Sequence, residues 1–479
     1  MKTYIKFITA VLFLILGADI YAQGSGSVGL TDAWTTSTAK TYTILSRGLY
    51  AIGKNPANLA LPGTGTVEFS THFPVPNMSL RVGTDFANLD EYNYFIGGMD
   101  SSGTQVSRLL DAADKQRFHD LFVDGGRILM STSFNHLGFV MNLGEKIGTF
   151  GFAVNDFVDF KFKIPVGLVD LLLLGNPQGS VIDINDLEAQ ASYTREYSFN
   201  YARDLGNFKP KFIQKLTAGV GVKLVHTYAY MGIQEVDTRI ETTGPTIEGY
   251  GKIKTYLGFS PDFGMEYDFD STSTGAENSM GPFPTPAGSA LGFDLGLSAI
   301  VNDRLSVGIA ITDIGSMTFD EKPVEYSGNS DIYITDITSQ EQRDSLTEKL
   351  RGEGKYISSF EKDLPTALRV GVAYYVYKSG VDDRYFLLGL DYNQGFNDEP
   401  RNSTKPRISL GGEWNATSWL PFLRGGFSFG GDDEFIWSVG AGFSIGPVEM
   451  NASIPDLQYI FTPGKVERIA FAVGGRWKF

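Results

Sequence analysis

The side chains that most often carry catalysis are few and scattered in this chain. Its four histidines, His72, His119, His136 and His226, show no metal-ligand spacing. The absence of cysteine excludes a thiolate nucleophile and thiolate metal sites. No glycine-rich phosphate-binding loop occurs. The sequence therefore predicts a protein that is not an enzyme, with no cofactor and no metal site.

Charged residues recur instead at alternate positions within otherwise apolar or small-residue stretches. They are Lys223, Asp294, Arg369, Asp391, Arg407, Glu413, Arg424 and Arg476. One interpretation is that they pair with one another and with an N-terminal segment, because buried charges need partners. The other is that a cation grips an anionic head group such as a carboxylate. On the second interpretation Arg369, Arg424 and Lys223 are candidate ligand-binding residues.

The elements that must position these charges show best at the end of the chain, from Val466 to Phe479. Ile469, Phe471 and Trp477 fall on one face of an extended chain, whereas small residues and Arg476 fall on the other. The same alternation recurs many times. It predicts an all-β protein, a transmembrane antiparallel β-barrel of about 14 strands, although twelve or sixteen would also fit. A slip of one residue would turn the charges toward lipid, at about 2–4 kcal/mol for each Lys or Arg at mid-depth.

Residues 1–22 have the features of an export signal. Lys2 and Lys6 precede an apolar core, Phe7 to Leu16, and Ile20-Tyr21-Ala22 is a typical cleavage site. No later stretch of about 18 to 20 apolar residues could form a membrane-spanning helix. We therefore expect cleavage of the signal and localisation in the outer membrane of a Gram-negative cell, in contact with its lipid. The net charge of −15 argues against nucleic acid as a partner.

Residues 23–64 contain no convincing strand and precede the region expected to form the barrel, residues 65–479. Within them, Asn55-Pro56-Ala57 is followed by Asn58-Leu59-Ala60. This pattern resembles the N-terminal plug of the FadL-type long-chain fatty acid transporters. The resemblance implies a short hatch inside a fourteen-stranded barrel, with Asn55, Pro56 and Ala57 as gating residues. The same residues also suit a helix start, with an Asn cap and Pro at the first position.

Two further features bear on how a ligand would enter. The first strand, expected over residues 66–83, contains Pro74 and Pro76, which should break it. The loop after the third strand holds an apolar run, Val166 to Leu174. This run either forms a small loop core or offers a collecting surface for ligand, which makes Leu171 and Leu173 candidate binding residues. Two other long polar loops are expected, to residue 288 with a protruding hairpin, and to residue 364 with a short helix near 343–350.

Two functions follow from these features. The first is passive uptake of a hydrophobic or amphipathic, fatty-acid-like small molecule, as the FadL resemblance implies. The alternative is a barrel that docks a secretion or surface protein on its loops, as the resemblance to PorV-type barrels of Bacteroidetes implies. A continuous apolar pocket beside Asn55 to Ala57 would favour uptake, whereas a polar, plugged interior would favour docking.

Overall fold

The computed structural model describes residues 32–479 except 98, 102–103, 107, 124, 176, 245, 266–280, 282, 336–338, 343, 345–352, 418 and 432–434. The expected export signal lies outside the described residues. So does the short helix expected over residues 343–350, apart from Asp344. None of the helices in the described part of the chain is long and apolar enough to cross a bilayer.

The wall of the molecule is a closed, antiparallel 14-strand barrel, as predicted. The first barrel strand is divided into two pieces, β1 and β2, and both pair with the last strand, β23, which closes the cylinder. The wall consists of β1 (Val67–Ser70), β2 (Asn77–Thr84), β5 (Gly126–Asn142), β6 (Thr149–Ile164), β8 (Glu188–Asp204), β9 (Lys215–Thr243), β11 (Gly288–Ile300), β12 (Leu305–Ile314), β17 (Ala367–Lys378), β18 (Tyr385–Gly395), β19 (Arg407–Asn415), β20 (Phe422–Gly430), β21 (Phe435–Ile445), β22 (Val448–Ile454) and β23 (Arg468–Lys478).

Apolar and polar side chains occupy opposite faces of this wall. In β23, Ile469 is 69% exposed and Phe471 37%, whereas Ala472 is 0% and Arg476 5% exposed. All eight alternating charges named above are buried inside. The predicted register is therefore confirmed, and the exposed face forms an apolar belt of the kind that meets lipid.

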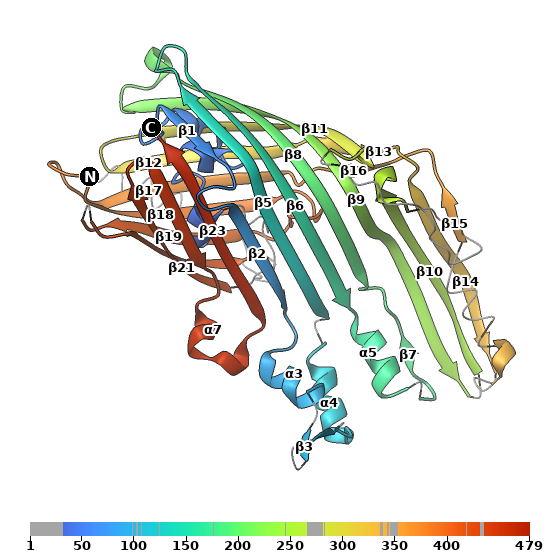
Figure 1. The fold of residues 1–479 in the computed structure, drawn as a ribbon. Helices are drawn as coiled ribbons and strands as arrows, with labels where there is room; N and C mark the ends of the chain where they lie inside the picture. Colours follow the sequence, from blue (N-terminus) through green and yellow to red (C-terminus); the bar gives the residue numbers. More distant parts are fainter. Residues whose placement is uncertain are drawn as a thin grey trace.

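The two ends of the barrel differ, as Figure 1 shows. At the turn end, neighbouring strands are joined by short turns, such as Gly446-Pro447 between β21 and β22, where Gly446 has φ +58°. The carboxyl end of β23 lies at this end. At the loop end, long connections carry α3 (Leu89–Phe95), α4 (Ala112–Asp120), α5 (Val166–Leu173) and α7 (Gln458–Phe461), as well as the hairpin β3 (Met99–Ser101) and β4 (Thr104–Val106).

The first strand breaks where the prolines predict. Ser70 pairs with Gly138 of β5 and Asn77 pairs with Asn135. Residues 71–76 therefore stand opposite only His136 and Leu137, and they leave the ladder. Pro74 and Pro76 cannot donate ladder hydrogen bonds, which explains why the pairing stops here.

At the loop end, part of the sheet continues beyond the barrel. Strand β9 runs to Thr243 and pairs with β10 (Thr246–Phe259), and the two form the expected protruding hairpin. β10 then pairs with β14 (Val324–Ile334), and β7 (Val181–Ile182) adds to the other side of β9. We call β7, β9 beyond residue 231, β10 and β14 the sheet extension.

The region between β12 and β17 corrects the prediction of a loop. It contains β13 (Ser316–Phe319), β14, β15 (Glu353–Tyr356) and β16 (Phe360–Asp363). Strand β13 pairs with β11 and β16. These strands lack the simple alternation of a membrane strand because their outer faces are not required to be apolar.

The described part of the N-terminal segment, residues 32–64, lies inside the barrel. It forms α2 (Ala33–Ser37) and two short 3-10 helices, η1 (Gly48–Ala51) and η2 (Pro56–Ala60). Helix α2 contacts β20 to β23, whereas η2 contacts β5, β6, β8, β9 and β11 on other sectors of the wall. Ile44, Ala51, Ala57 and Leu59 are fully buried. The interior is thus filled by protein at this level.

Candidate functional site

The Asn-Pro-Ala motif fastens the N-terminal segment to the barrel wall. The Asn55 side chain caps η2 by accepting a hydrogen bond from the Ala57 N–H, at 3.1 Å. Its amide nitrogen donates to the Thr43 carbonyl and to Ser298 Oγ of β11, each at 3.0 Å. Ser298 Oγ in turn donates to Asn58 Oδ1 at 2.6 Å. Both proposed roles of the motif, helix start and plug element, are therefore compatible with its geometry.

Two wall glycines allow this close approach. A Cβ added at Gly296 would lie 2.1 Å from Asn55 Oδ1, and one at Gly219 would lie 2.4 Å from the Ala57 nitrogen. Any other residue at these positions would push the motif inward. The motif residues make these wall contacts and line none of the cavities described below.

A second attachment centres on Tyr42. The backbone N–H groups of Tyr42 and Thr43 donate to Asp391 Oδ2 of β18, at 2.7 and 2.6 Å. The Tyr42 hydroxyl accepts hydrogen bonds from Arg369 at 2.8 Å and Arg407 at 3.3 Å. Burial raises the pKa of Tyr42, but the charges of Arg369 and Arg407 outweigh it and lower that pKa to about 8.

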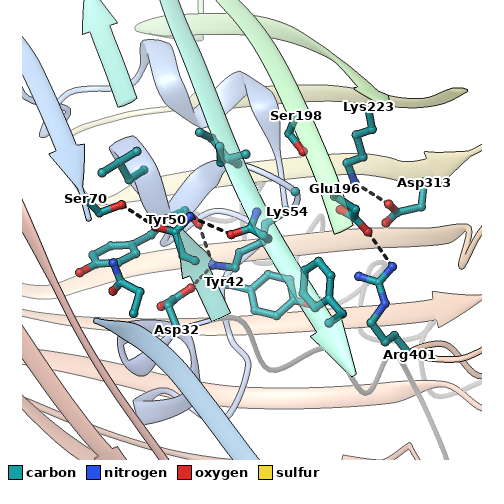
Figure 2. A pocket seen from close by; sticks show the side chains of 18 of the residues that line it. Asp32, Tyr42, Tyr50, Lys54, Ser70, Glu196, Ser198, Lys223, Asp313 and Arg401 are labelled. Atoms are coloured by element: carbon teal, nitrogen blue, oxygen red, sulfur yellow. Dashed lines mark hydrogen bonds and ion pairs between the residues drawn. The ribbon is translucent and has the colours of Figure 1, made fainter. Parts of the chain in front are cut away.

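Above the N-terminal segment, toward the loop end, lies a central cavity of about 90 Å³ (Figure 2). Its apolar lining includes Leu49, Ile52, Ala153 and Phe157. Its charged lining consists of Asp32, Lys54, Glu196, Lys223, Asp313, Arg369 and Arg401. None of the cavities described here is an apolar pocket beside Asn55 to Ala57, the feature that would favour uptake. The cavity that exists is small, mixed and strongly charged.

Most charges in the central cavity have a carboxylate partner. Lys223 forms ion pairs with Asp294, at 3.1 Å, and with Asp313, and Lys54 pairs with Asp32. Arg369 differs because its hydrogen-bond partner is the Tyr42 hydroxyl, and its Nε has no partner. Of the predicted binding residues, Arg369 is thus the cation best placed to accept an anionic ligand group, whereas Lys223 is occupied structurally.

Arg401 belongs to this site, although the sequence did not single it out. It lies in the connection between β18 and β19 at the loop end, with a positive φ of 69°. Its side chain reaches Glu196 of β8 at 2.6 Å and lies 3.9 Å above the Phe157 ring of β6. It also lines two smaller cavities of about 40 Å³ each. Arg401 therefore stands between the central cavity and the two cavities nearer the loop end. Its polar loop has no periodicity that could have predicted this position.

Arg424 lies apart from the central cavity, in a vestibule of about 300 Å³ at the turn end. It pairs with Glu413 and donates to Asn451 Oδ1 at 2.6 Å. Tyr50 lines both this vestibule and the central cavity, so the N-terminal segment separates them. The predicted lumen charges accordingly pair with each other and with the N-terminal segment, as the first interpretation held.

Leu171 and Leu173 lie far from both cavities, on α5. Within this helix Val169 is 4% exposed, Leu171 and Leu173 are half-buried, and Leu172 is 75% exposed. Asp170 meets His119 of α4 at 3.1 Å, which joins the two loop helices. The apolar run therefore combines a small loop core with an exposed apolar surface.

Arrangements typical of enzymes do not form in the described part of the chain. No group of three His, Asp or Glu side chains there is placed to hold a metal ion. The chain does contain two Gly-x-Ser-x-Gly pentads, at 426–430 and 442–446, but Ser428 and Ser444 lie within β20 and β21. A nucleophile elbow requires a sharp strand-to-helix turn, which neither pentad has.

The fold and the apolar belt define a membrane-spanning β-barrel with an N-terminal segment folded into its lumen. The chain belongs to the family of unknown function DUF5723, whose model matches residues 62–454. No curated protein matches it in sequence.

Solved barrels resemble the chain over nearly its whole length. The toluene transporter TbuX of Ralstonia pickettii is 13% identical, with 96% of this chain and 99% of that chain covered, at a TM-score of 0.42. The toluene transporter TodX of P. putida is 12% identical, with coverages of 96% and 99% and a TM-score of 0.44. A Pseudomonas aeruginosa FadL homologue is 13% identical, with coverages of 95% and 100% and a TM-score of 0.42.

Proposed function

We propose that this barrel is a channel for passive uptake of amphipathic, fatty-acid-like small molecules across the outer membrane, to which an N-terminal export signal directs it. One observation carries the proposal. The break in the first strand lies beside the central cavity, because Ser70, Asn77 and Asn135, which flank the break, line that cavity. A ligand in the cavity thus meets a part of the wall where the ladder hydrogen bonds are interrupted.

The chemistry on the two sides of the break suits such a ligand. On the outer side, Phe73 is 68% exposed and the His72 ring lies 5.0 Å from Phe134. These rings meet the apolar belt. On the inner side, Phe157 and Ile52 supply apolar contact, and Arg369 supplies a cation without a carboxylate partner within 4 Å. A molecule with an apolar body and one acidic group matches both sides.

Passage toward the periplasm requires the N-terminal segment to move, since it fills the lumen. The contacts of Asn55, Asn58 and Tyr42 with the wall are mainly hydrogen bonds. Each is worth only about 0.5–1.5 kcal/mol net, so they can be exchanged for water or ligand contacts. We propose that Asn55, Pro56 and Ala57 gate this movement as a hatch. The exposed apolar side of α5, with Leu172 flanked by Leu171 and Leu173, would collect ligand at the loop end.

A disulfide across the break tests the proposal. Because the chain contains no cysteine, two introduced cysteines can pair only with each other within one molecule. Ser70 Oγ lies 2.7 Å from Asn135 Oδ1, so Ser70→Cys with Asn135→Cys would tie the two sides of the break together. The control is Ser79→Cys with Ser133→Cys, whose hydroxyls also lie 2.7 Å apart, across the intact ladder of β2 and β5. Radiolabelled amphipathic acids would be followed into a deletion strain carrying each variant.

We expect the oxidised break pair to lose most uptake and to regain it on reduction, while the control pair keeps uptake in both states. Equal uptake by both oxidised pairs would refute the route through the break. A deletion strain whose uptake of a broad panel of hydrophobic compounds equals wild type would refute the transport function itself.

A second candidate function is docking of a secretion or surface protein. The observation that favours it is the sheet extension, together with a polar interior filled by protein. Strands β9, β10 and β14 project beyond the wall and present mixed charges, including Lys252–Glu235 and Lys254–Glu325 pairs. Affinity purification from detergent extracts would recover a partner with the wild-type chain. The same experiment with the hairpin tip between residues 236 and 253 deleted should lose that partner.

A further inference from the structure

The vestibule at the turn end has an aromatic wall. At about 300 Å³ it is the largest of the cavities described above, and it lies on the opposite side of the N-terminal segment from the central cavity. Tyr375 and Tyr385 meet edge to face with ring centres 5.7 Å apart, and Phe422, Leu45 and Leu387 complete the wall. Such a wall accepts a flat apolar body.

The two carboxylates of the vestibule are already saturated. Glu413 accepts hydrogen bonds from Arg424 and Tyr385, and from the Trp34 ring nitrogen at 3.1 Å. Glu449 accepts from Arg476 at 2.7 Å and from Asn451 at 3.1 Å. Neither carboxylate has spare capacity to neutralise another cation.

Two further cations in the vestibule have only neutral hydrogen-bond acceptors among the described residues. Arg47 donates to the carbonyls of Ile44, Ser46 and Pro62, at 2.5, 2.8 and 3.1 Å. Lys478 donates to the Gly63 carbonyl at 2.6 Å. Within the described residues, neither forms an ion pair with a carboxylate. Because Pro62 and Gly63 are consecutive, the same short segment holds both positive groups at the rim of one cavity.

We infer that this vestibule is a binding site for an aryl monoanion, with its acid group between Arg47 and Lys478 and its ring against Tyr375 and Tyr385. The lining holds four cations, Arg47, Arg424, Arg476 and Lys478, against the carboxylates of Glu413 and Glu449. An acid group there would reduce this excess of positive charge, and the two cations would make charge-assisted hydrogen bonds to it. Trp34 and Tyr50, stacked with centroids 6.1 Å apart, close the inner side. This limits the body of the ligand to a compact ring rather than a long chain. The site goes beyond the proposed uptake function, because binding here needs no passage through the barrel.

The test is binding of 4-(trifluoromethyl)benzoate to the purified, full-length protein in neutral detergent, measured by fluorine NMR. The uncharged 4-(trifluoromethyl)benzamide reports partition into the micelle. The variant Arg47→Gln with Lys478→Gln removes both cations. Its matched control, Lys146→Gln with Lys211→Gln, removes two exposed cations from turns at the same end. A further variant, Ser444→Trp, fills the vestibule from an exposed position and leaves both cations in place.

We expect the wild type and the control variant to bind the benzoate at least about tenfold more tightly than the benzamide. The Arg47/Lys478 variant should lose that preference, and Ser444→Trp should lose binding of both compounds above the micelle background. Equal affinity for benzoate and benzamide in the wild type would overturn the inference. Benzoate binding that survives Ser444→Trp would also overturn the inference. This second variant decides the question even if the Arg47/Lys478 variant does not fold. Loss of uptake in cells with retained benzoate binding would refute the channel and leave this site intact.

Discussion

Replacing Arg401 with alanine should open the loop end of the lumen. The connection between β18 and β19 crosses to the opposite wall through this side chain, which is 13% exposed and lies 2.6 Å from Glu196. Asp159 lies 3.8 Å away and adds a second carboxylate. A hydrogen bond between charged groups contributes about 1.5–3 kcal/mol, so its loss should raise the open population of the loop roughly 10- to 150-fold.

Hydrogen exchange of residues 396–406 measures this population directly, because amides exchange through local opening. Glu196→Gln keeps a hydrogen-bond acceptor for Arg401 but removes the negative charge, so it should raise the exchange rate of this loop by less than Arg401→Ala does. The control is Arg384→Ala, whose partner Asp382 is exposed at the turn end. Loss of such an exposed ion pair changes the free energy of unfolding by only about 0–1 kcal/mol. Because Arg384 lies at the other end of the barrel, this variant should leave exchange of residues 396–406 unchanged.

Exchange rates of residues 396–406 in Arg401→Ala that stay within about threefold of wild type would refute this expectation. In that case other contacts, and not Arg401, hold the loop closed. Asn402, which donates to the Thr366 carbonyl at 2.9 Å, would then be the residue to examine. Planar-bilayer conductance gives an independent measure, since removal of the side chain joins three cavities that it now separates.

Three more predictions follow from the same contacts. Tyr42 should ionise near pH 8 in an absorbance titration at 295 nm. Because this pKa lies below the value near 10 of an unfolded tyrosine, ionised Tyr42 stabilises the folded protein fully above pH 10, and this stabilisation is lost as the pH falls through 8. Tyr42→Phe or Arg369→Gln should remove this pH dependence of stability. Gly296→Ala should displace Asn55, since the new Cβ would lie 2.1 Å from Asn55 Oδ1. Residues 32–64 should then be more sensitive to protease. The barrel itself should stay folded, so its migration in unheated gels should not change. Leu295→Arg, on the lipid-facing side and 50% exposed, should destabilise the barrel in denaturant titrations in lipid by about 2–4 kcal/mol, and a loss below about 0.5 kcal/mol would contradict the assigned faces.

The barrel wall could be predicted from the sequence because lipid imposes a strict rule on it. Every second residue must be apolar, so Phe471 and Arg476 reveal their faces without any knowledge of their neighbours. The break at Pro74 and Pro76 could be predicted for a similar reason, because proline removes a ladder hydrogen bond wherever it lies.

The site could be predicted only in part. The alternation shows that Lys223, Arg369 and Arg424 face the lumen, but it does not show their height along the barrel or their partners. The structure places them in two separate cavities. Of these three cations, only Arg369 has no carboxylate partner among the described residues. Arg401 and Arg47 were missed because they lie on irregular chain, where side-chain direction depends on local turns. The strands beyond the wall were missed for the same reason: water on their outer faces removes the periodic signal.

The division of the first strand has a consequence for how the cylinder is sealed. The barrel closes where β23 pairs with β1 and β2. Residues Glu68 and Phe69 of β1 pair with β23, and so do residues Met78 to Gly83 of β2. Until β23 pairs with both, one edge of β23 and one edge of β1 and β2 are free, and the unpaired N–H and C=O groups of these edges are costly in hydrocarbon. The completed wall thus has its shortest stretch of pairing, two residue pairs, between β1 and β23. If the wall parts anywhere without unfolding, this stretch should part first.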